Sequence, residues 1–246
     1  MMQQYGLIGM PLAQSFSKKY FTEKFEREKI ANATYELFQL ENISLLTDLL
    51  AANGSLKGLN VTIPYKEQVM PFLTELEEEA KAIAAVNCIK ITNGKLKGFN
   101  TDAPAFKQSL LPQLKPHHKK ALVLGTGGAA KAVLFVLKSL GIEYIFVSRK
   151  AGAGFTYEEL NKNILEEYPL IINATPLGSF PKVDTAPAIP YEFLSEKNYL
   201  YDLVYNPAKT LFLQKGEERG AAIKNGYEML VGQAELSWQI WNDAAV

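Results

Sequence analysis

Short apolar runs alternate with amphipathic stretches along the first half of the chain. The apolar runs predict strands, and the stretches with apolar positions at helical spacing predict helices. Strands are predicted at 5–9, 33–40 and 58–63, and helices at 18–29, 43–52, 66–72 and 75–85. Residues 88–99 alternate around Asn93-Gly94, which predicts a hairpin. Strands that alternate with helices are typical of a parallel sheet.

The second half repeats this alternation after a polar, proline-bounded segment at 112–116, which is a plausible domain boundary. Strands are predicted at 121–125, 143–147, 170–173, 199–204 and 221–224. Helices are predicted at 132–140 and 227–242. The chain is therefore expected to fold as two α/β domains, with a ligand cleft between them at the carboxyl ends of strands.

A glycine-rich turn follows the strand at 121–125, with the sequence Gly125-Thr126-Gly127-Gly128-Ala129-Ala130. Gly125 permits a tight turn, Gly127 lets the backbone approach a pyrophosphate, and the small Ala130 lets helix and strand pack closely. Free N–H groups at the start of the helix face the anion. The pattern predicts a dinucleotide site, and the alternative is a helix–strand packing turn with no nucleotide.

The next strand ends in Ser148-Arg149-Lys150. A protein that prefers NAD usually has an acidic residue at this position, which accepts from the ribose 2′-hydroxyl. Arg149 could instead bind a 2′-phosphate through its planar fork. NADP is therefore favoured over NAD, and the alternative is a solvated basic loop.

Composition and net charge bear on which partners and which cellular location to expect. The chain has 246 residues, is 48% apolar and has a formal net charge of zero, which gives no electrostatic signature for nucleic acid or an acidic membrane. A single cysteine, Cys88, excludes an internal disulfide and favours a reducing, cytoplasmic location. We find no apolar run of transmembrane length and no N-terminal signal pattern.

The only two histidines, His117 and His118, are adjacent in a basic loop at 115–120, interpreted as a solvated linker. A histidine-based metal site is therefore not expected. Acid–base chemistry must come from Lys, Asp, Glu or Tyr.

The strand at 58–63 carries candidate chemistry at its end. Alternation puts Asn60 and Thr62 on one face, and Pro64 breaks the ladder so that Lys66 leaves the sheet at its carboxyl edge. Lys66 is either a catalytic acid or a solvated lysine. Taken alone, Asp102 is interpreted as a helix cap and Asn87 as a helix C-terminal residue.

Two serines lie at the start of the first helix. Ser17 is interpreted as its N-cap, but Ser15 and Ser17 together also suit a carboxylate, because N–H donors and the helix dipole converge there. Gln233 falls on or beside the apolar stripe of the last helix, where its amide needs a partner. Either a ligand hydroxyl or the backbone could supply that partner.

Taken together, these segments resemble the shikimate dehydrogenase family, and the match runs nearly end to end. The resemblance is carried by Gly9-x-Pro11 with Ser15-x-Ser17, by residues 60–67, 85–87, 100–102 and 125–130, by Asn173-Ala-Thr175, and by residues 201–207 and 226–234.

The resemblance implies an enzyme that interconverts 3-dehydroshikimate and shikimate by hydride transfer with NADP, in the biosynthesis of chorismate and the aromatic amino acids. It implies that Lys66 and Asp102 form the catalytic pair. The implied substrate-binding residues are Ser15, Ser17, Asn60, Thr62, Asn87, Tyr205 and Gln233, with Asp102 also contacting a ring hydroxyl. The implied cofactor-binding residues are Gly125, Thr126, Gly127, Gly128, Ala129, Ser148, Arg149, Lys150, Asn173, Thr175, Leu203 and Gly226.

The same resemblance implies an N-terminal α/β substrate domain at 1–103 and a Rossmann-like NADP domain at 104–225. The C-terminal segment 226–246 is then expected to return to the first domain. No metal is expected, and the chain is expected to be a monomer or homodimer that binds a small molecule and neither nucleic acid nor a membrane.

Two departures from the family pattern stand out. The family usually has Asn-Arg-Thr and a further Arg, whereas here Arg149 is followed by Lys150 and no second Arg. The segment between Lys150 and Tyr168 is short, which predicts a trimmed helix. Two alternatives stay open: a quinate/shikimate dehydrogenase that uses NAD, and a non-catalytic NADP-binding sensor on the same scaffold.

Overall fold

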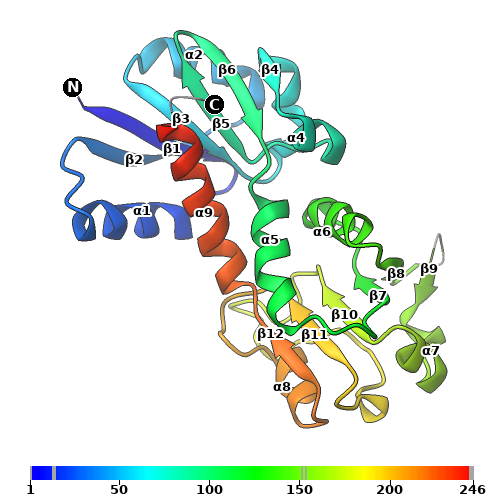
Figure 1. Ribbon diagram of the computed structural model, residues 1–246. Coiled ribbons are helices and arrows are strands. Elements are labelled where there is room, and N and C mark those ends of the chain that lie inside the picture. Colours follow the sequence, from blue (N-terminus) through cyan, green and yellow to red (C-terminus); the bar gives the residue numbers. More distant parts are fainter. Residues whose placement is uncertain (1, 13–14, 151, 153, 244–246) are drawn as a thin grey trace. The chain divides into compact units, whose positions relative to one another are not determined.

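The computed structural model describes residues 2–12, 15–150, 152 and 154–243, without the side chains of residues 128 and 129 (Figure 1). The chain divides into two compact units. The first unit is Met1–Thr101 with Ala234–Val246, and the second is Asp102–Gln233. The first crossing therefore falls two residues before the expected one at 103/104, and the return falls at 233/234.

The first unit contains an α/β sheet with helices on both faces. Its elements are β1 (Gln3–Gly9), α1 (Phe16–Arg27), β2 (Ala33–Gln39), α2 (Leu46–Ala52), β3 (Leu56–Val61), α3 (Tyr65–Gln68), β4 (Glu75–Leu76), α4 (Glu78–Ile83), β5 (Cys88–Thr92) and β6 (Lys95–Phe99). The strand order is β2-β1-β3-β5-β6-β4. Strands β1, β2 and β3 are parallel, and β5 runs antiparallel to both β3 and β6.

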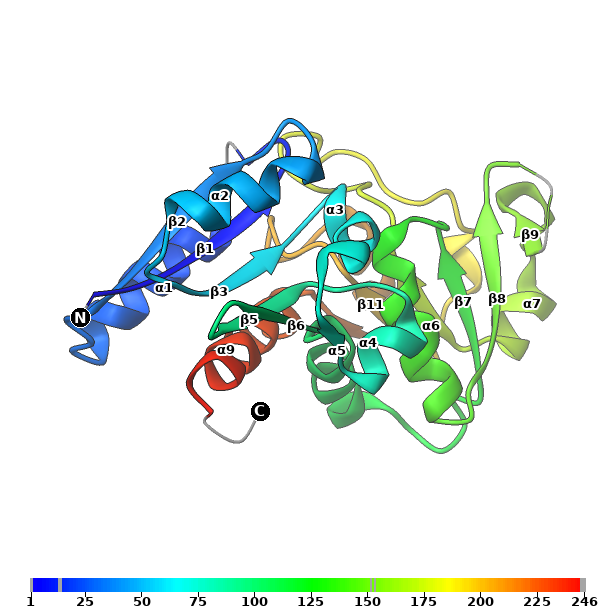
Figure 2. The same cartoon turned by 90° about the horizontal axis from the view of Figure 1, so that it is seen from above.

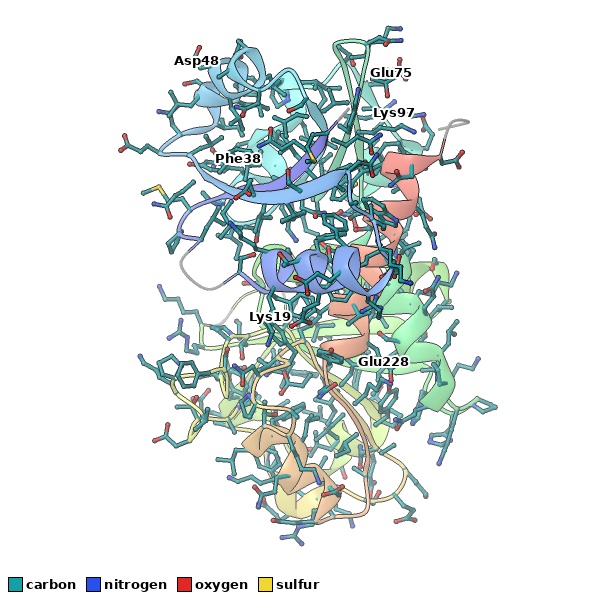
Figure 3. The ribbon with its side chains drawn as sticks, turned by 90° about the vertical axis from the view of Figure 1, so that its left-hand side faces the viewer. Lys19, Phe38, Asp48, Glu75, Lys97 and Glu228 are labelled. Atoms are coloured by element: carbon teal, nitrogen blue, oxygen red, sulfur yellow. The ribbon has the colours of Figure 1, made fainter. Side chains whose placement is uncertain are left out.

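Two apolar clusters cover the two faces of this sheet. One cluster packs Ile8 and Leu59 against Leu46 of α2 and Tyr65 of α3. The other packs Tyr5 and Tyr35 against α1 and against the C-terminal residues Ala234 and Trp241. Figure 3 shows Phe38 and Asp48 on the side of α2, and Lys19 on the side of α1. The end of the C-terminal helix is thus part of the core of the first unit.

Several sequence interpretations in this unit are wrong in detail. The helix predicted at 75–85 begins only at Glu78, because Glu75 and Leu76 pair with β6 and Glu77 then caps the helix by accepting from two backbone N–H groups. The helix predicted at 43–52 begins with a 3₁₀ turn, Ile43–Leu45, capped by Asn42. The hairpin around Asn93-Gly94 is confirmed, and both turn residues have positive φ.

The second unit is a Rossmann-like domain. Its elements are α5 (Asp102–Leu110), β7 (Lys120–Leu124), α6 (Gly128–Ser139), β8 (Glu143–Ser148), β9 (Gly154–Thr156), α7 (Lys162–Glu167), β10 (Leu170–Asn173), β11 (Tyr199–Asp202), α8 (Leu211–Glu217), β12 (Ala222–Lys224) and α9 (Tyr227–Asn242), which continues into the first unit.

All six strands of the second sheet are parallel, in the order β12-β11-β10-β7-β8-β9 (Figure 1). Figure 2 shows β8 between β7 and β9. Counted from β7, this is the doubly wound order 3-2-1-4-5-6, in which ligands bind where the order reverses. Here that switch point lies between β7 and β10. The trimmed helix predicted after Lys150 is α7, of six residues, and a short strand, β9, precedes it.

The loop at 115–120 is not simply a solvated linker. His118 is buried, its Nδ1 accepts from the backbone N–H of Lys115, and both histidine rings contact the carbonyl oxygen of Lys197. Burial lowers the pKa of His118, which favours the neutral ring at this packed position. No helix within the described part of the chain is long and apolar enough to cross a membrane.

Candidate functional site

The polar residues predicted for the substrate gather at one edge of the first sheet. Strands β1 and β3 are parallel, so Ser15, which follows β1, and Thr62, which follows β3, leave the sheet at the same edge. Asn87 immediately precedes the antiparallel strand β5, which places it at that edge as well. Backbone bonds from Thr62 N to Ile8 O at 2.9 Å and from Val61 N to Asn87 O at 2.8 Å fix these three segments against one another.

Ser15 occupies the N-cap position of α1, so the interpretation of Ser17 as the cap is wrong. The Ser15 hydroxyl does not cap the helix, and its oxygen is buried without a hydrogen-bond partner among the described residues. Buried polar atoms are rarely left unpaired, because losing water without a replacement costs about 1–3 kcal/mol. A hydroxyl in this state at a helix start is suited to a bound anionic group.

Asn60 lies in the buried interior just beneath this edge. Its amide oxygen accepts from the hydroxyl of Tyr35 at 2.8 Å, and its amide nitrogen donates to Ser237 Oγ at 2.8 Å and to the carbonyl of Asn87 at 3.3 Å. Ser17 lies close enough to the same tyrosine to lower its pKa, against the larger effect of burial, which raises it. Ser17 and Asn60 thus lie beside one side chain.

The side chain of Asn87 is held by Thr101, the residue before Asp102. Its amide oxygen accepts from the backbone N–H of Thr101 at 2.7 Å, and its amide nitrogen donates to Thr101 Oγ1 at 2.9 Å. The interpretation of Asn87 as a helix C-terminal residue is therefore wrong, because α4 ends at Ile83 and Ala84 follows it in the left-handed conformation.

Lys66 lies in the single turn of α3, directly after β3. Its backbone carbonyl accepts from Val86 N at 2.8 Å, and the hydroxyl of the preceding Tyr65 donates to the carbonyl of Leu40 at 2.6 Å. Both contacts anchor the turn that carries the lysine. Its side chain is only partly exposed.

Three predicted residues belong to the second unit. Asp102 is the first residue of α5 rather than a cap before the helix, and Tyr205 follows β11 and is exposed. The side-chain amide of Gln233 on α9 donates to the carbonyl of Leu230 at 2.9 Å. The pairing of Lys66 with Asp102 stays a prediction.

A pocket of about 760 Å³ opens at the switch point of the second sheet. It is lined by Gly125, Thr126, Gly127, Val147, Ser148, Arg149, Lys150, Tyr157, Ala174, Thr175, Pro176 and Leu177. These residues come from the turn after β7, the end of β8 and the turn after β10. The lining includes two cations and no carboxylate, so the described residues fit an anionic nucleotide.

The glycine turn is built as the sequence predicts. Gly125 has φ +94°, and a Cβ there would lie 2.7 Å from Thr175 Cγ2, so only glycine fits without strain. A Cβ on Gly127 would instead meet open space, which leaves the backbone accessible to a pyrophosphate. Gly128 begins α6, and Ala129 follows in its first turn.

The basic end of β8 forms one wall of the pocket. Arg149 and Lys150 are exposed, while the hydroxyl of Ser148 donates to the Lys150 carbonyl at 2.7 Å and shapes the turn. Tyr157 stands beside Arg149, and the pKa of Tyr157 is raised chiefly by burial. The cations are therefore presented to a ligand, while Ser148 supports them.

Asn173 lies beneath the pocket rather than in its lining. It is fully buried, its amide nitrogen donates to Asp202 Oδ1 at 2.9 Å, and its amide oxygen accepts from Thr175. Leu203 donates its N–H to the Asn173 carbonyl, and Gly226 packs so close to Leu203 that a Cβ would lie 2.3 Å from the Leu203 carbonyl oxygen. Asn173, Leu203 and Gly226 therefore do not line the pocket but support the segments that do.

Sequence reasoning missed Tyr35, Ser237 and Tyr157. A tyrosine buried in a strand needs a partner for its hydroxyl, which is a usable signal for Tyr35. Ser237 lies at helical spacing with Ala234 and Trp241 on the buried stripe of α9, so it too needs a buried partner. Nothing in the sequence distinguishes Tyr157 from other aromatic residues.

The family model for the shikimate dehydrogenase substrate binding domain matches residues 7–89. A shikimate dehydrogenase (NADP(+)) of Clostridium beijerinckii is 40% identical over 98% of this chain and 93% of its own length. One from Desulforamulus reducens is 36% identical over 97% and 89%.

Among solved structures, shikimate 5-dehydrogenase from Thermus thermophilus in complex with NADP(H) and shikimate is 30% identical, with a TM-score of 0.84 over 98% of this chain and 94% of that one. Identity above 30% across almost the whole length, together with the geometry of both units, shows that this chain belongs to the shikimate dehydrogenase family.

Proposed function

We propose that this protein is an NADP-dependent shikimate dehydrogenase, which interconverts 3-dehydroshikimate and shikimate. The proposal is carried by the 40% identity to a relative named for this activity, over 98% of the chain. The residues of both units support it independently. A hydroxyl- and amide-rich edge in the first unit suits a polyhydroxylated acid, and a cationic glycine-turn pocket in the second suits NADP.

We assign the substrate carboxylate to Ser15 and Ser17. The Ser15 hydroxyl is buried and unpartnered among the described residues, so it can donate to the carboxylate without giving up another bond. The first backbone N–H groups of α1 add to the positive end of the helix dipole. Asn60, Thr62, Asn87, Tyr205 and Gln233 are assigned to the ring, and Asp102 to one of its hydroxyls.

We assign NADP to the pocket of the second unit. The open backbone at Gly127, with Thr126, Gly128 and Ala129 around it, would hold the pyrophosphate, and Arg149 with Lys150 would hold the 2′-phosphate. When bound, the reduced nicotinamide supplies the hydride. Arg149 is the sole arginine in the lining, so one guanidinium fork carries most of the preference for NADP over NAD.

Lys66 is assigned the role of general acid toward the ketone. The ketone oxygen gains negative charge as its carbon is reduced, and an ammonium within hydrogen-bond reach stabilises that charge and donates the proton. In the reverse direction the neutral amine takes the proton back. Asp102 is assigned to keep Lys66 charged and oriented, since a neighbouring carboxylate favours the ammonium form.

Turnover of Lys66→Ala with shikimate and NADP tests this assignment. Loss of a positioned acid lowers kcat by about 10²–10⁴-fold, while binding of shikimate weakens much less. Lys57→Ala is the matched control, because Lys57 is an exposed lysine of β3 in the same unit. Wild-type turnover in Lys66→Ala would remove Lys66 from the mechanism.

A further inference from the structure

Five polar side chains form one continuous hydrogen-bonded network beneath the carboxyl edge of the first sheet. The members are Tyr35, Asn60, Ser237, Thr101 and Asn87, linked in that order. All five lie in the first unit. Tyr35 and Ser237 have no role in the function proposed above, yet Tyr35 is 3% exposed and Ser237 is fully buried.

The hydrogen bonds of Asn60 define what it can offer a ligand. A side-chain amide has two N–H donors and two acceptor positions on its oxygen. Both donors are used, on Ser237 Oγ at 2.8 Å and on the Asn87 carbonyl at 3.3 Å. One acceptor position is used by the Tyr35 hydroxyl at 2.8 Å. Among the described contacts, one acceptor position on Oδ1 is left for a ligand.

The protein also fixes the orientation of this amide. If the amide of Asn60 were flipped, its oxygen would face the carbonyl oxygen of Asn87, which cannot donate. Its nitrogen would then face Tyr35, and the proton of Tyr35 would lose its acceptor. The Asn87 carbonyl therefore sets which end of the amide is the acceptor, since the hydroxyls of Ser237 and Tyr35 can each donate or accept. These two hydroxyls hold the amide in place from opposite ends.

Tyr35 is itself held rigidly. Its ring stacks on Phe21 with centroids 4.5 Å apart and planes 15° apart. The only proton of the phenol goes to Asn60. Burial raises the pKa of Tyr35 well above its usual value, so the phenol stays protonated and a donor at neutral pH.

We propose that Tyr35 and Ser237 are positioning residues for substrate recognition, an inference that rests on the proposed function. Together with the Asn87 carbonyl they hold Asn60 with only an acceptor position open to a ligand, which selects a ring hydroxyl and rejects a ring carbonyl. Asn60 therefore faces a group that is a hydroxyl in both 3-dehydroshikimate and shikimate, and not the carbon that is reduced.

Ser237 extends the network toward the catalytic aspartate. Its hydroxyl lies 3.3 Å from Thr101 Oγ1, and Thr101 directly precedes Asp102 in the chain. Ser237 belongs to α9, whose C-terminal part packs in the core of the first unit. Helix α9 thus contributes Ser237, whose hydroxyl holds the side-chain amide of Asn60 in place.

The variant Tyr35→Phe tests the proposal, because it removes the hydroxyl and keeps the stacked ring. We expect KM for shikimate to rise about 3- to 10-fold, as for the loss of one hydrogen bond, with kcat and KM for NADP within about 2-fold of wild type. Tyr5→Phe is the matched control. Tyr5 is a buried tyrosine of the same apolar cluster, stacked on Trp241, and its hydroxyl bonds Gln3 outside the network.

Background variants separate positioning from general destabilisation. We expect Ser237→Ala to raise KM for shikimate as Tyr35→Phe does. In an Asn60→Ala background we expect Tyr35→Phe to raise KM no further, because Tyr35 acts through the amide of Asn60. The proposal is overturned if Tyr35→Phe leaves KM unchanged, if Tyr5→Phe raises it equally, or if the effect persists without Asn60. A folded wild-type protein that does not turn over shikimate overturns the proposed function instead.

Discussion

The amide oxygen of Asn173 accepts two hydrogen bonds from Thr175, one from its backbone N–H at 3.0 Å and one from its hydroxyl at 2.6 Å. Asn173 is fully buried, whereas Thr175 lines the nucleotide pocket. Asn173 therefore holds in place the turn after β10, which forms one wall of the pocket. We expect Asn173→Ala to weaken NADPH binding about 10-fold, although Asn173 is not in the pocket lining.

Titration of NADPH fluorescence measures this effect, and Asn198→Ala is its control. Asn198 is also a buried asparagine of the second unit, and its amide bonds the carbonyl of Leu165 and the N–H of Ser195, away from the pocket. The control is expected to lower the melting temperature and leave NADPH affinity unchanged. Equal loss of affinity in both variants would show a general effect of destabilisation.

Arg149 is the residue to which we assign selectivity for NADP. We expect Arg149→Ala to lower kcat/KM with NADP about 10- to 100-fold and to change kcat/KM with NAD by less than about 3-fold, since only NADP carries the 2′-phosphate. Arg219→Ala is the control, because Arg219 is an exposed arginine of the same unit outside the pocket lining. A parallel loss with both cofactors would show that Arg149 does not distinguish the 2′-phosphate, and no loss with either would make it a solvated bystander.

Lys24 on α1 is a buried cation that joins this helix to α9. Its Nζ lies 3.0 Å and 2.9 Å from the two carboxylate oxygens of Glu235, and its side chain is 4% exposed. Because Glu235 is one-third exposed and can regain water, we expect Lys24→Met to cost about 1–3 kcal/mol in the free energy of unfolding, below the usual cost of breaking a fully buried pair.

Urea denaturation measures this cost against a pair on the same helix. Lys19, labelled in Figure 3, lies 3.8 Å from Glu23 with 78% of its side chain exposed. Lys19→Met is expected to change the free energy of unfolding by less than about 0.5 kcal/mol. Equal values for the two variants would show that burial of Lys24 contributes nothing.

Asp202 makes stability depend on pH. Burial raises the pKa of this carboxyl from 3.8 to about 6, although Thr210, Val204 and Asn173 all donate to it. The folded protein therefore holds this proton more tightly than the unfolded chain. Asp202 therefore stabilises the folded protein most below about pH 4, where its carboxyl is protonated. This contribution is lost as pH rises through 6. Above that pH the free energy of unfolding is lower by about 3 kcal/mol than it would be with the carboxyl protonated.

Urea unfolding of wild type and Asp202→Asn at pH 4.5 and pH 7.5 measures this dependence. An asparagine keeps a neutral polar group at the position and does not titrate, so we expect the variant to lose less stability than wild type between the two pH values. The same change in both proteins would contradict the assignment to Asp202.

The second unit was predictable from sequence because its local signals agree with its packing. The glycine turn requires positive φ at Gly125 and open space at Gly127, and both requirements show in the residue types. The strands β8 and β10 begin and end within about a residue of the predicted positions. Strand β9 was missed, because three residues with no alternation become a strand only by pairing with β8.

The sequence names the residues of the proposed substrate edge but not their hydrogen-bond partners. Asn60 and Asn87 are separated by 27 residues in sequence, and their hydrogen bond depends on the antiparallel register of β3 and β5. The roles of Tyr35 and Ser237 arise from contacts over 25 and 177 residues, which no local pattern encodes. The N-cap was misplaced from Ser15 to Ser17 because either serine is an acceptable cap on propensity alone.

Initial rates of the purified protein with shikimate or quinate, each with NADP or NAD, test the proposed activity and its cofactor together. We expect rapid turnover with shikimate and NADP and weak turnover with the other three pairs. Faster turnover with quinate or with NAD would contradict the proposed substrate or cofactor. No turnover with any pair, in a folded protein that still binds NADPH, would contradict the proposed enzymatic activity itself.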